Sequence, residues 1–174
     1  IPILVAILAA ISMLVTAALE VPPWPIFISW ALYFVAGSKP SRLHKEIIGL
    51  TGGIILGYLT LAAAPYYSQL FGNTFGVPLT VATAAFIIVI LELTDWFELA
   101  PAYFFAYAGY FAYVFGSFGG PGTTATNAII PFWILIMVGL LFGYVNAFLR
   151  KKILEREGLF GPAQETVFDK EVKA

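Results

Sequence analysis

The sequence contains no cysteine and a single histidine, His44. Without thiols there is no disulfide, iron–sulfur cluster, thiolate zinc site or cysteine nucleophile. One imidazole also excludes a haem or zinc site with two histidine ligands from the same chain. No group of His, Asp and Ser has catalytic spacing. We therefore expect no metal, no cofactor and no enzymatic activity.

Charged residues are also scarce. Only 11% of the residues are charged, whereas 60% are hydrophobic and the mean hydropathy is +0.90. Soluble domains contain about 25% charged residues. A soluble fold of this length could not bury so much apolar surface, so we expect the lipid bilayer to be the solvent. The net charge of −1 gives no electrostatic basis for nucleic acid binding.

Six apolar segments predict an all-α, polytopic membrane protein with about six transmembrane helices. The segments are Ile1–Leu19, Pro25–Ala36, Ile47–Ala64, Leu79–Leu93, Pro101–Phe115 and Ile129–Leu149. A full crossing takes roughly 20 residues, so the second and fifth segments are short. We interpret the first segment as a span and not as a signal peptide. Residues 1–149 would form the transmembrane domain, and residues 150–174 a cytoplasmic helix extension and tail.

The basic residues predict the topology. All nine lie either between the second and third segments or after the sixth, and they are Lys39, Arg42, Lys45, Arg150, Lys151, Lys152, Arg156, Lys170 and Lys173. The positive-inside rule places both groups in the cytoplasm. Four crossings between the groups return the chain to the same side. We therefore expect a multi-pass protein of the inner membrane with both termini in the cytoplasm. The predicted outer loops, Pro65–Val77 and Gly116–Ala128, contain no Lys or Arg.

The two halves of the chain, residues 1–64 and 77–149, resemble each other. A shift of 77 aligns Ala31-x-Tyr33-Phe34 with Ala108-x-Tyr110-Phe111, and a shift of 86 aligns Gly53-x-x-x-Gly57-Tyr58 with Gly139-x-x-x-Gly143-Tyr144. Because three spans per half is an odd number, the second half would be inverted in the membrane. Such 3+3 inverted repeats are typical of transporters. Chance similarity between apolar helices is the alternative.

Glycine recurs every fourth residue in the third and sixth segments. The glycines are Gly49, Gly53, Gly57, Gly139 and Gly143. Small residues on one face let helix backbones approach closely. We interpret these faces as helix packing within the chain, with a subunit interface as the alternative. A single six-helix unit is small for a pore, so we expect a homo-oligomer.

Proline precedes both short helices. Pro25 and Pro101 fit the first turn of a helix, where the missing amide hydrogen is unpaired anyway. The free amides of these helix starts could also bind a polar solute. Four acidic residues lie at or just beyond span ends, namely Glu20, Glu92, Asp95 and Glu98, and Glu92 is the deepest of them. It would be a proton-linked carboxylate if it were buried with a raised pKa, and otherwise an interfacial one.

Aromatic residues crowd the two short helices. Trp30 and Tyr33 lie in the second segment, and Tyr107 and Tyr110 lie in the fifth. Tyr and Trp often form belts at membrane interfaces, but in the fifth segment they run along the whole length. They either border a solute path between these helices or pack the core.

Several motifs resemble a known family. They are the stretch from Trp24-Pro25-Ile26-Phe27 through Ser29 to Gly37-Ser38, then Gly53 and Gly57, and in the second half Phe97, Pro101, Phe105, Ala108, Phe111 and Ala112. Between Trp24 and Tyr144 the chain resembles the small bacterial inner-membrane proteins known as domain of unknown function 1097. The family's usual Pro-Gly is here Pro101-Ala102. The resemblance implies the fold and membrane placement, and it implies no catalytic residue.

These observations leave two function hypotheses. The first is a channel or carrier for a small polar solute, with the path between the second and fifth helices. No Lys or Arg lies within the spans, so a neutral or weakly charged solute fits better than a strongly bound anion. The second is a structural or accessory subunit that docks other membrane proteins and transports nothing.

Overall fold

The computed structural model describes residues 1–158, and these residues form helices joined by short connections, with no strand among them. The α-helices are α1 (Pro2–Ala18), α2 (Trp24–Val35), α3 (Leu43–Leu91), α4 (Ala100–Phe115) and α5 (Ala125–Arg156), and a single 3-10 turn, η1 (Pro40–Arg42), precedes α3. The predicted all-α class is confirmed.

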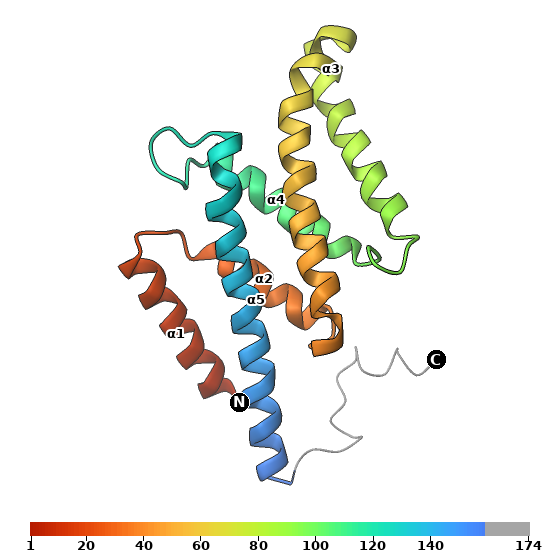
Figure 1. The fold of residues 1–174 in the computed structure, drawn as a ribbon. Helices are drawn as coiled ribbons and strands as arrows, with labels where there is room; N and C mark the ends of the chain where they lie inside the picture. The colour runs from red at the N-terminus through yellow and green to blue at the C-terminus, as the bar shows by residue number, and fades with distance from the viewer. Residues whose placement is uncertain (159–174) are drawn as a thin grey trace.

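Helix α3 consists of two antiparallel legs. Gly72 has φ 79° and ψ 160°, so the chain reverses there and separates a first leg, residues 43–71, from a second leg, residues 73–91 (Figure 1). A positive φ of this kind is readily adopted by glycine. The legs pack closely beside the turn, because a Cβ on Gly76 would collide with the backbone of Ser68.

The outer loop predicted at Pro65–Val77 is therefore wrong. Both of its arms are helical, and the connection reduces to Gly72. Pro65 lies inside the first leg and Pro78 inside the second, so neither proline ends a helix. Proline is tolerated inside apolar helices when neighbouring groups form hydrogen bonds with the backbone groups that it leaves unpaired. The sequence pattern does not show whether such neighbouring groups are present.

The last helix is longer than its apolar segment. Thr124 caps its start in a capping box, in which the Asn127 amide donates to Thr124 Oγ1 at 3.3 Å and the Thr124 amide donates to Asn127 Oδ1 at 2.7 Å. α5 then continues past the predicted end at Leu149 to Arg156. The loop predicted at Gly116–Ala128 is accordingly shorter, ending at Thr124. The predicted tail beyond residue 158 lies outside the described residues.

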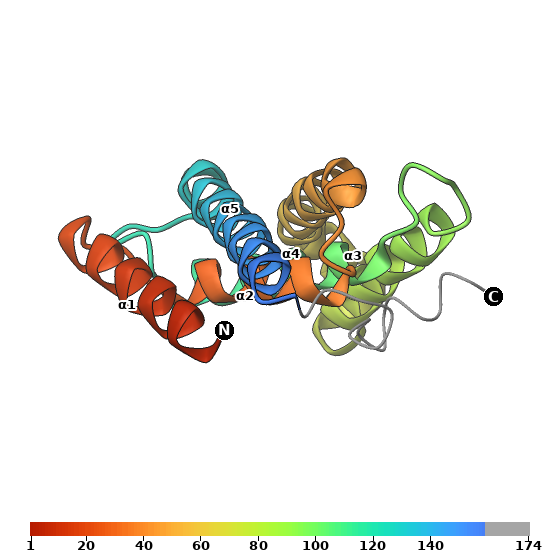
Figure 2. The same ribbon diagram turned by 90° about the horizontal axis from the view of Figure 1, so that it is seen from below.

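The two short helices occupy the centre of the molecule. Seen from below, α2 and α4 lie between α5 and the first leg of α3, with α1 and the second leg of α3 at the two outer edges (Figure 2). α2 packs mainly on α5 and α4 mainly on α3, and α2 and α4 also contact each other. Each half of the chain thus packs its short helix on a long helix of the other half.

The two ends of the molecule differ in charge. The connection between α2 and α3, which carries Lys39 and Arg42, lies at the same end as the last turn of α5, which carries Arg156 (Figure 1). The Gly72 turn and the connection between α4 and α5 lie at the opposite end and contain no Lys or Arg.

Large apolar side chains cover the outer helices. Ile3 and Leu14 on α1 and Phe86 on the second leg of α3 are each more than 60% exposed. α3 and α5 are long and apolar enough to cross a membrane, whereas α1 and α2 are apolar but shorter. The six apolar segments of the sequence correspond in order to α1, α2, the two legs of α3, α4 and α5.

Candidate functional site

Helix α4 packs on the glycine face of α3, which is formed by Gly49, Gly53 and Gly57. A Cβ on Gly53 would collide with the carbonyl oxygen of Tyr103 and lie 2.8 Å from the Ala106 methyl group. A Cβ on Gly57 would lie 2.8 Å from the ring of Tyr110. Gly49 meets Ala102 in the same way, one turn earlier. The absence of side chains on this face therefore allows the two helices to touch.

Helix α2 packs on the glycine face of α5, which is formed by Gly139 and Gly143. A Cβ on Gly139 would collide with the carbonyl oxygen of Ile26 and with Ser29 Oγ. A Cβ on Gly143 would lie 2.7 Å from Cβ of Tyr33. In this structure the five predicted packing glycines all make contacts within one chain.

The contact between α3 and α4 and the contact between α5 and α2 use equivalent positions. Gly53 and Gly139, 86 positions apart, meet the carbonyls of Tyr103 and Ile26, which are 77 positions apart. The two shifts are those that align the halves of the sequence. The matching extends to the next turn, where Gly57 and Gly143 meet Tyr110 and Tyr33. The similarity in sequence therefore coincides with equivalent helix contacts.

The four aromatic residues expected beside a solute path are all buried. Tyr33 and Tyr110 are 0% exposed, so neither ring touches a space large enough for a water molecule. Trp30 and Tyr107 are 5% and 8% exposed. The structure brings Tyr33 and Tyr110 into one core cluster, together with Phe132 of α5.

Two tyrosine hydroxyls have partners inside the protein. Tyr107 donates to Thr60 Oγ1 on α3 at 3.0 Å, and Tyr110 donates to the carbonyl oxygen of Ala125 at the start of α5. Each bond ties α4 to a neighbouring helix. Together with their burial, these bonds show that the space beside Tyr33 and Tyr110 is closed in this structure.

The two prolines lie at helix starts, as their sequence context predicts. α2 begins at Trp24, one residue before Pro25, and α4 begins at Ala100, one residue before Pro101. The next amide in each helix is already bonded, since Ile26 donates to Pro23 at 3.1 Å and Ala102 donates to Leu99 at 3.0 Å. These two amides are therefore not free for a solute.

The acidic residue singled out from the sequence is not buried. Glu92 is exposed at the C-terminal end of α3 and is not brought near the four aromatic residues. A neighbouring carboxylate, Glu98, lies on the connection to α4, where Lys45 Nζ donates to Glu98 Oε1 at 2.7 Å. That hydrogen bond lowers the pKa of the Glu98 carboxyl. It ties the start of α3 to the connection before α4.

The structure points to a different carboxylate, Glu46. Glu46 is 0% exposed in the first turn of α3, and neither of its oxygens has a hydrogen-bond partner among residues 1–158. It lies within electrostatic range of Arg42 and of Tyr33. The sequence reasoning missed it because it follows Lys45 in a polar stretch. The signal was its position three residues before Gly49, which places it on the glycine face of the helix.

Within residues 1–158 no three His, Asp or Glu side chains are grouped so as to hold a metal ion.

Comparison with known proteins extends the resemblance described above. No curated protein and no solved structure matches the chain. A family model described as protein of unknown function (DUF1097) matches residues 2–151, which includes all five α-helices except the last turns of α5. Since the match covers most of the sequence, the chain belongs to the DUF1097 family.

Proposed function

We propose that this protein is a multi-pass membrane carrier for a small polar solute, with a path between α2 and α4 that is closed in this structure. The carrier would be built from two inverted halves. α1, α2 and the first leg of α3 form one half, and the second leg of α3, α4 and α5 form the other. The doubled contact between glycine faces and short helices supports this arrangement. So do the chain directions in Figure 1, in which corresponding helices run opposite ways.

Glu46 is the observation that carries the proposal. Burying a carboxyl group without a hydrogen bond costs free energy, and ionisable groups inside membrane proteins usually belong to ion or proton pathways. Glu46 lies one turn before Gly49, which meets Ala102 of α4, and it is within electrostatic range of Tyr33 of α2. A proton or cation bound there would act on both short helices. We therefore assign the coupling role, expected at Glu92 from the sequence, to Glu46.

The side chains at the centre favour a neutral or weakly charged solute. Tyr33, Tyr107 and Tyr110 would offer hydroxyl groups, and their rings would exclude large or strongly hydrated species. The hydroxyl bonds of Tyr107 to Thr60 and of Tyr110 to Ala125 are contacts that an opening motion would exchange for contacts with the solute. A carrier that alternates between closed and open states accounts for the burial of these residues better than a permanently open channel.

Solute flux tests the proposal. Liposomes that contain the purified full chain should swell several-fold faster than protein-free liposomes in an inward gradient of urea or glycerol, and no faster in a sucrose gradient. Tyr107→Phe, which removes one hydroxyl while keeping the ring, should reduce the flux. The control Tyr66→Phe, at an exposed position on α3, should not. Equal swelling with and without protein for both solutes would count against a path.

The orientation is a second test. We expect both termini in the cytoplasm of the inner membrane, because Lys39, Arg42 and Arg156 lie at one end of the molecule. A reporter enzyme that is active only outside the cytoplasm should be inactive when fused after Lys152. The same reporter should be active when inserted after Gly120, between α4 and α5. An active fusion after Lys152 would reverse the assigned topology.

A structural or accessory subunit is the second candidate function. The observation that favours it is the closed packing of Tyr33 and Tyr110 together with the apolar outer faces of α1 and the second leg of α3. Because the glycine faces are occupied within the chain, a homo-oligomer or a contact with other membrane subunits would use these outer helices. Absence of flux together with stable association with another membrane protein would support this function.

A further inference from the structure

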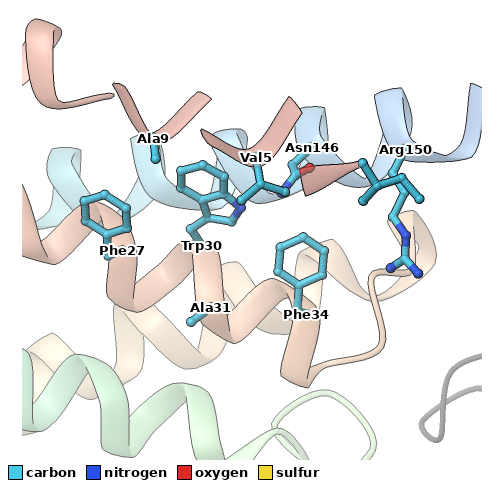
Figure 3. Close-up of a pocket in the computed structure, with 9 residues that line it drawn as sticks. Val5, Ala9, Phe27, Trp30, Ala31, Phe34, Asn146 and Arg150 are labelled. Carbon is cyan, nitrogen blue, oxygen red and sulfur yellow. The ribbon is translucent and has the colours of Figure 1, made fainter. Parts of the chain in front are cut away.

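A groove of about 300 Å³ lies between α1, α2 and α5, away from the tyrosines at the centre (Figure 3). α1 is attached to the rest of the protein mainly through α5 and stands off from α2, so the groove has helices on its sides and remains open along part of its length. No residue of the proposed coupling site lines it.

Most of the groove wall is apolar. Phe27, Trp30 and Phe34 form a row along one face of α2, with Val5 and Ala9 of α1 opposite (Figure 3). The row follows from helical spacing, because residues three and seven positions apart share a face. A long apolar ligand, rather than a water-soluble one, would be complementary to this wall.

One end of the groove is polar. Asn146 and Arg150, four positions apart on α5, lie beside Phe34 at the end farther from Phe27 (Figure 3). Asn146 is 2% exposed and its Oδ1 has no hydrogen-bond partner, and the buried Nε of Arg150 has none either. Within residues 1–158 no carboxylate forms an ion pair with Arg150. An unpaired buried polar group is unfavourable. Arg150 Nε lacks a hydrogen-bond acceptor, which an anionic group would supply, and Asn146 Oδ1 lacks a hydrogen-bond donor.

We infer that this groove binds an anionic phospholipid, with an acyl chain along the row Phe27, Trp30 and Phe34 and the phosphate at Arg150. Arg150 directly follows the apolar run that ends at Leu149, and it lies at the end of the protein assigned to the cytoplasm. A membrane span that ends at Leu149 would bring Arg150 to the level of the lipid phosphates. Guanidinium groups suit phosphate oxygens because they donate two parallel hydrogen bonds. Asn146, one turn deeper, faces the glycerol region of the lipid. The inference uses the membrane placement proposed above but does not depend on transport.

The test is lipid binding to the purified full chain in detergent. Phosphatidylglycerol with brominated acyl chains should quench the fluorescence of Trp30, whereas brominated phosphatidylcholine should quench it only at higher concentration. Trp30→Phe should remove the quenching that distinguishes the two lipids. Arg150→Gln should weaken phosphatidylglycerol binding about fivefold, the effect of one cation beside an anionic headgroup. Arg156→Gln removes a charge from an exposed site on the same helix and should leave binding unchanged.

A second variant keeps the test valid if Arg150→Gln fails to fold. Ala9→Phe fills the groove and keeps its charge, so it should abolish the difference in quenching between the two lipids while leaving solute flux intact. Three results would overturn the inference. They are equal quenching by the two lipids, equal losses in Arg150→Gln and Arg156→Gln, and unchanged quenching in Ala9→Phe. Competition by inorganic phosphate alone would assign the site to a free anion instead.

Discussion

Gly139→Ala should destabilise the protein by on the order of 1–3 kcal/mol, the usual cost of overpacking a core. Alanine favours a helix over glycine by about 1 kcal/mol, so on an open helix face the same change would stabilise. Here the new methyl group collides with the carbonyl oxygen of Ile26, which belongs to the backbone and cannot rotate away. α2 must therefore move away from α5. Thermal unfolding of the purified protein in detergent measures the difference.

Because the same kind of glycine contact occurs in both halves, the stability cost of one substitution predicts the cost of its counterpart. Gly53→Ala should cost about as much as Gly139→Ala, because its methyl group meets the corresponding carbonyl, that of Tyr103. Gly57→Ala should cost less, because its methyl group meets the ring of Tyr110, which can shift slightly. Gly143→Ala should cost nearly as much as Gly139→Ala, because its methyl group meets Cβ of Tyr33, which is fixed to the backbone. Gly53→Leu and Gly143→Leu should yield little folded protein. The control Ala62→Leu, at an exposed position on α3, should be neutral. Unchanged stability in both alanine variants at Gly53 and Gly139 would mean that these helices do not meet.

Glu46→Leu should raise the stability of the protein and abolish solute flux together. Leucine removes a buried carboxyl group that has no hydrogen-bond partner. Removing this group should raise the free energy of unfolding by about 1–3 kcal/mol. The same change removes the group to which we assign coupling. Glu46→Gln keeps the shape and removes the charge, so it should fold normally with reduced flux. Unfolding temperature and the liposome swelling assay give the two readouts.

The matched control for Glu46 is Glu92→Gln. Glu92 directly follows α3 at its other end and is exposed. Its replacement should change neither stability nor flux by a measurable amount. If Glu46→Leu lowered the unfolding temperature, the carboxylate would have a structural partner. If the flux of Glu46→Leu equalled that of the wild-type protein, the coupling role would be wrong.

The sequence predicted the helices better than their connections. Pro25 and Pro101 marked helix starts correctly, because a proline in the first turn has a local steric cause. Pro65 was misinterpreted as the start of a loop that ended at Val77. Whether a proline ends a helix depends on the neighbouring groups that satisfy the backbone, and those groups are distant in sequence. The sharp turn needed only Gly72.

The candidate site was predicted in part. The glycines were identified as packing positions from their spacing alone, but their partners, such as Tyr103 and Ile26, came only from the structure. Glu92 was singled out because an apolar run leads into it, and Glu46 was not considered, because burial depends on which helix face meets a neighbour. The groove at Arg150 could not be predicted, since it results from how far α1 stands from α2.

The exchange of partners between the two halves has a consequence for biosynthesis. When α4 emerges from the ribosome, the glycine face of α3 on which it packs (Gly49, Gly53 and Gly57) has already been synthesised. α2 is instead synthesised before its packing partner, because Gly139 of α5 lies 110 positions after Ser29 of α2. At about 5–20 residues per second, that distance takes roughly 5–20 s to translate. During this interval the Ser29 face of α2 lacks its partner, and a chain truncated before α5 would expose it permanently to quality-control proteases.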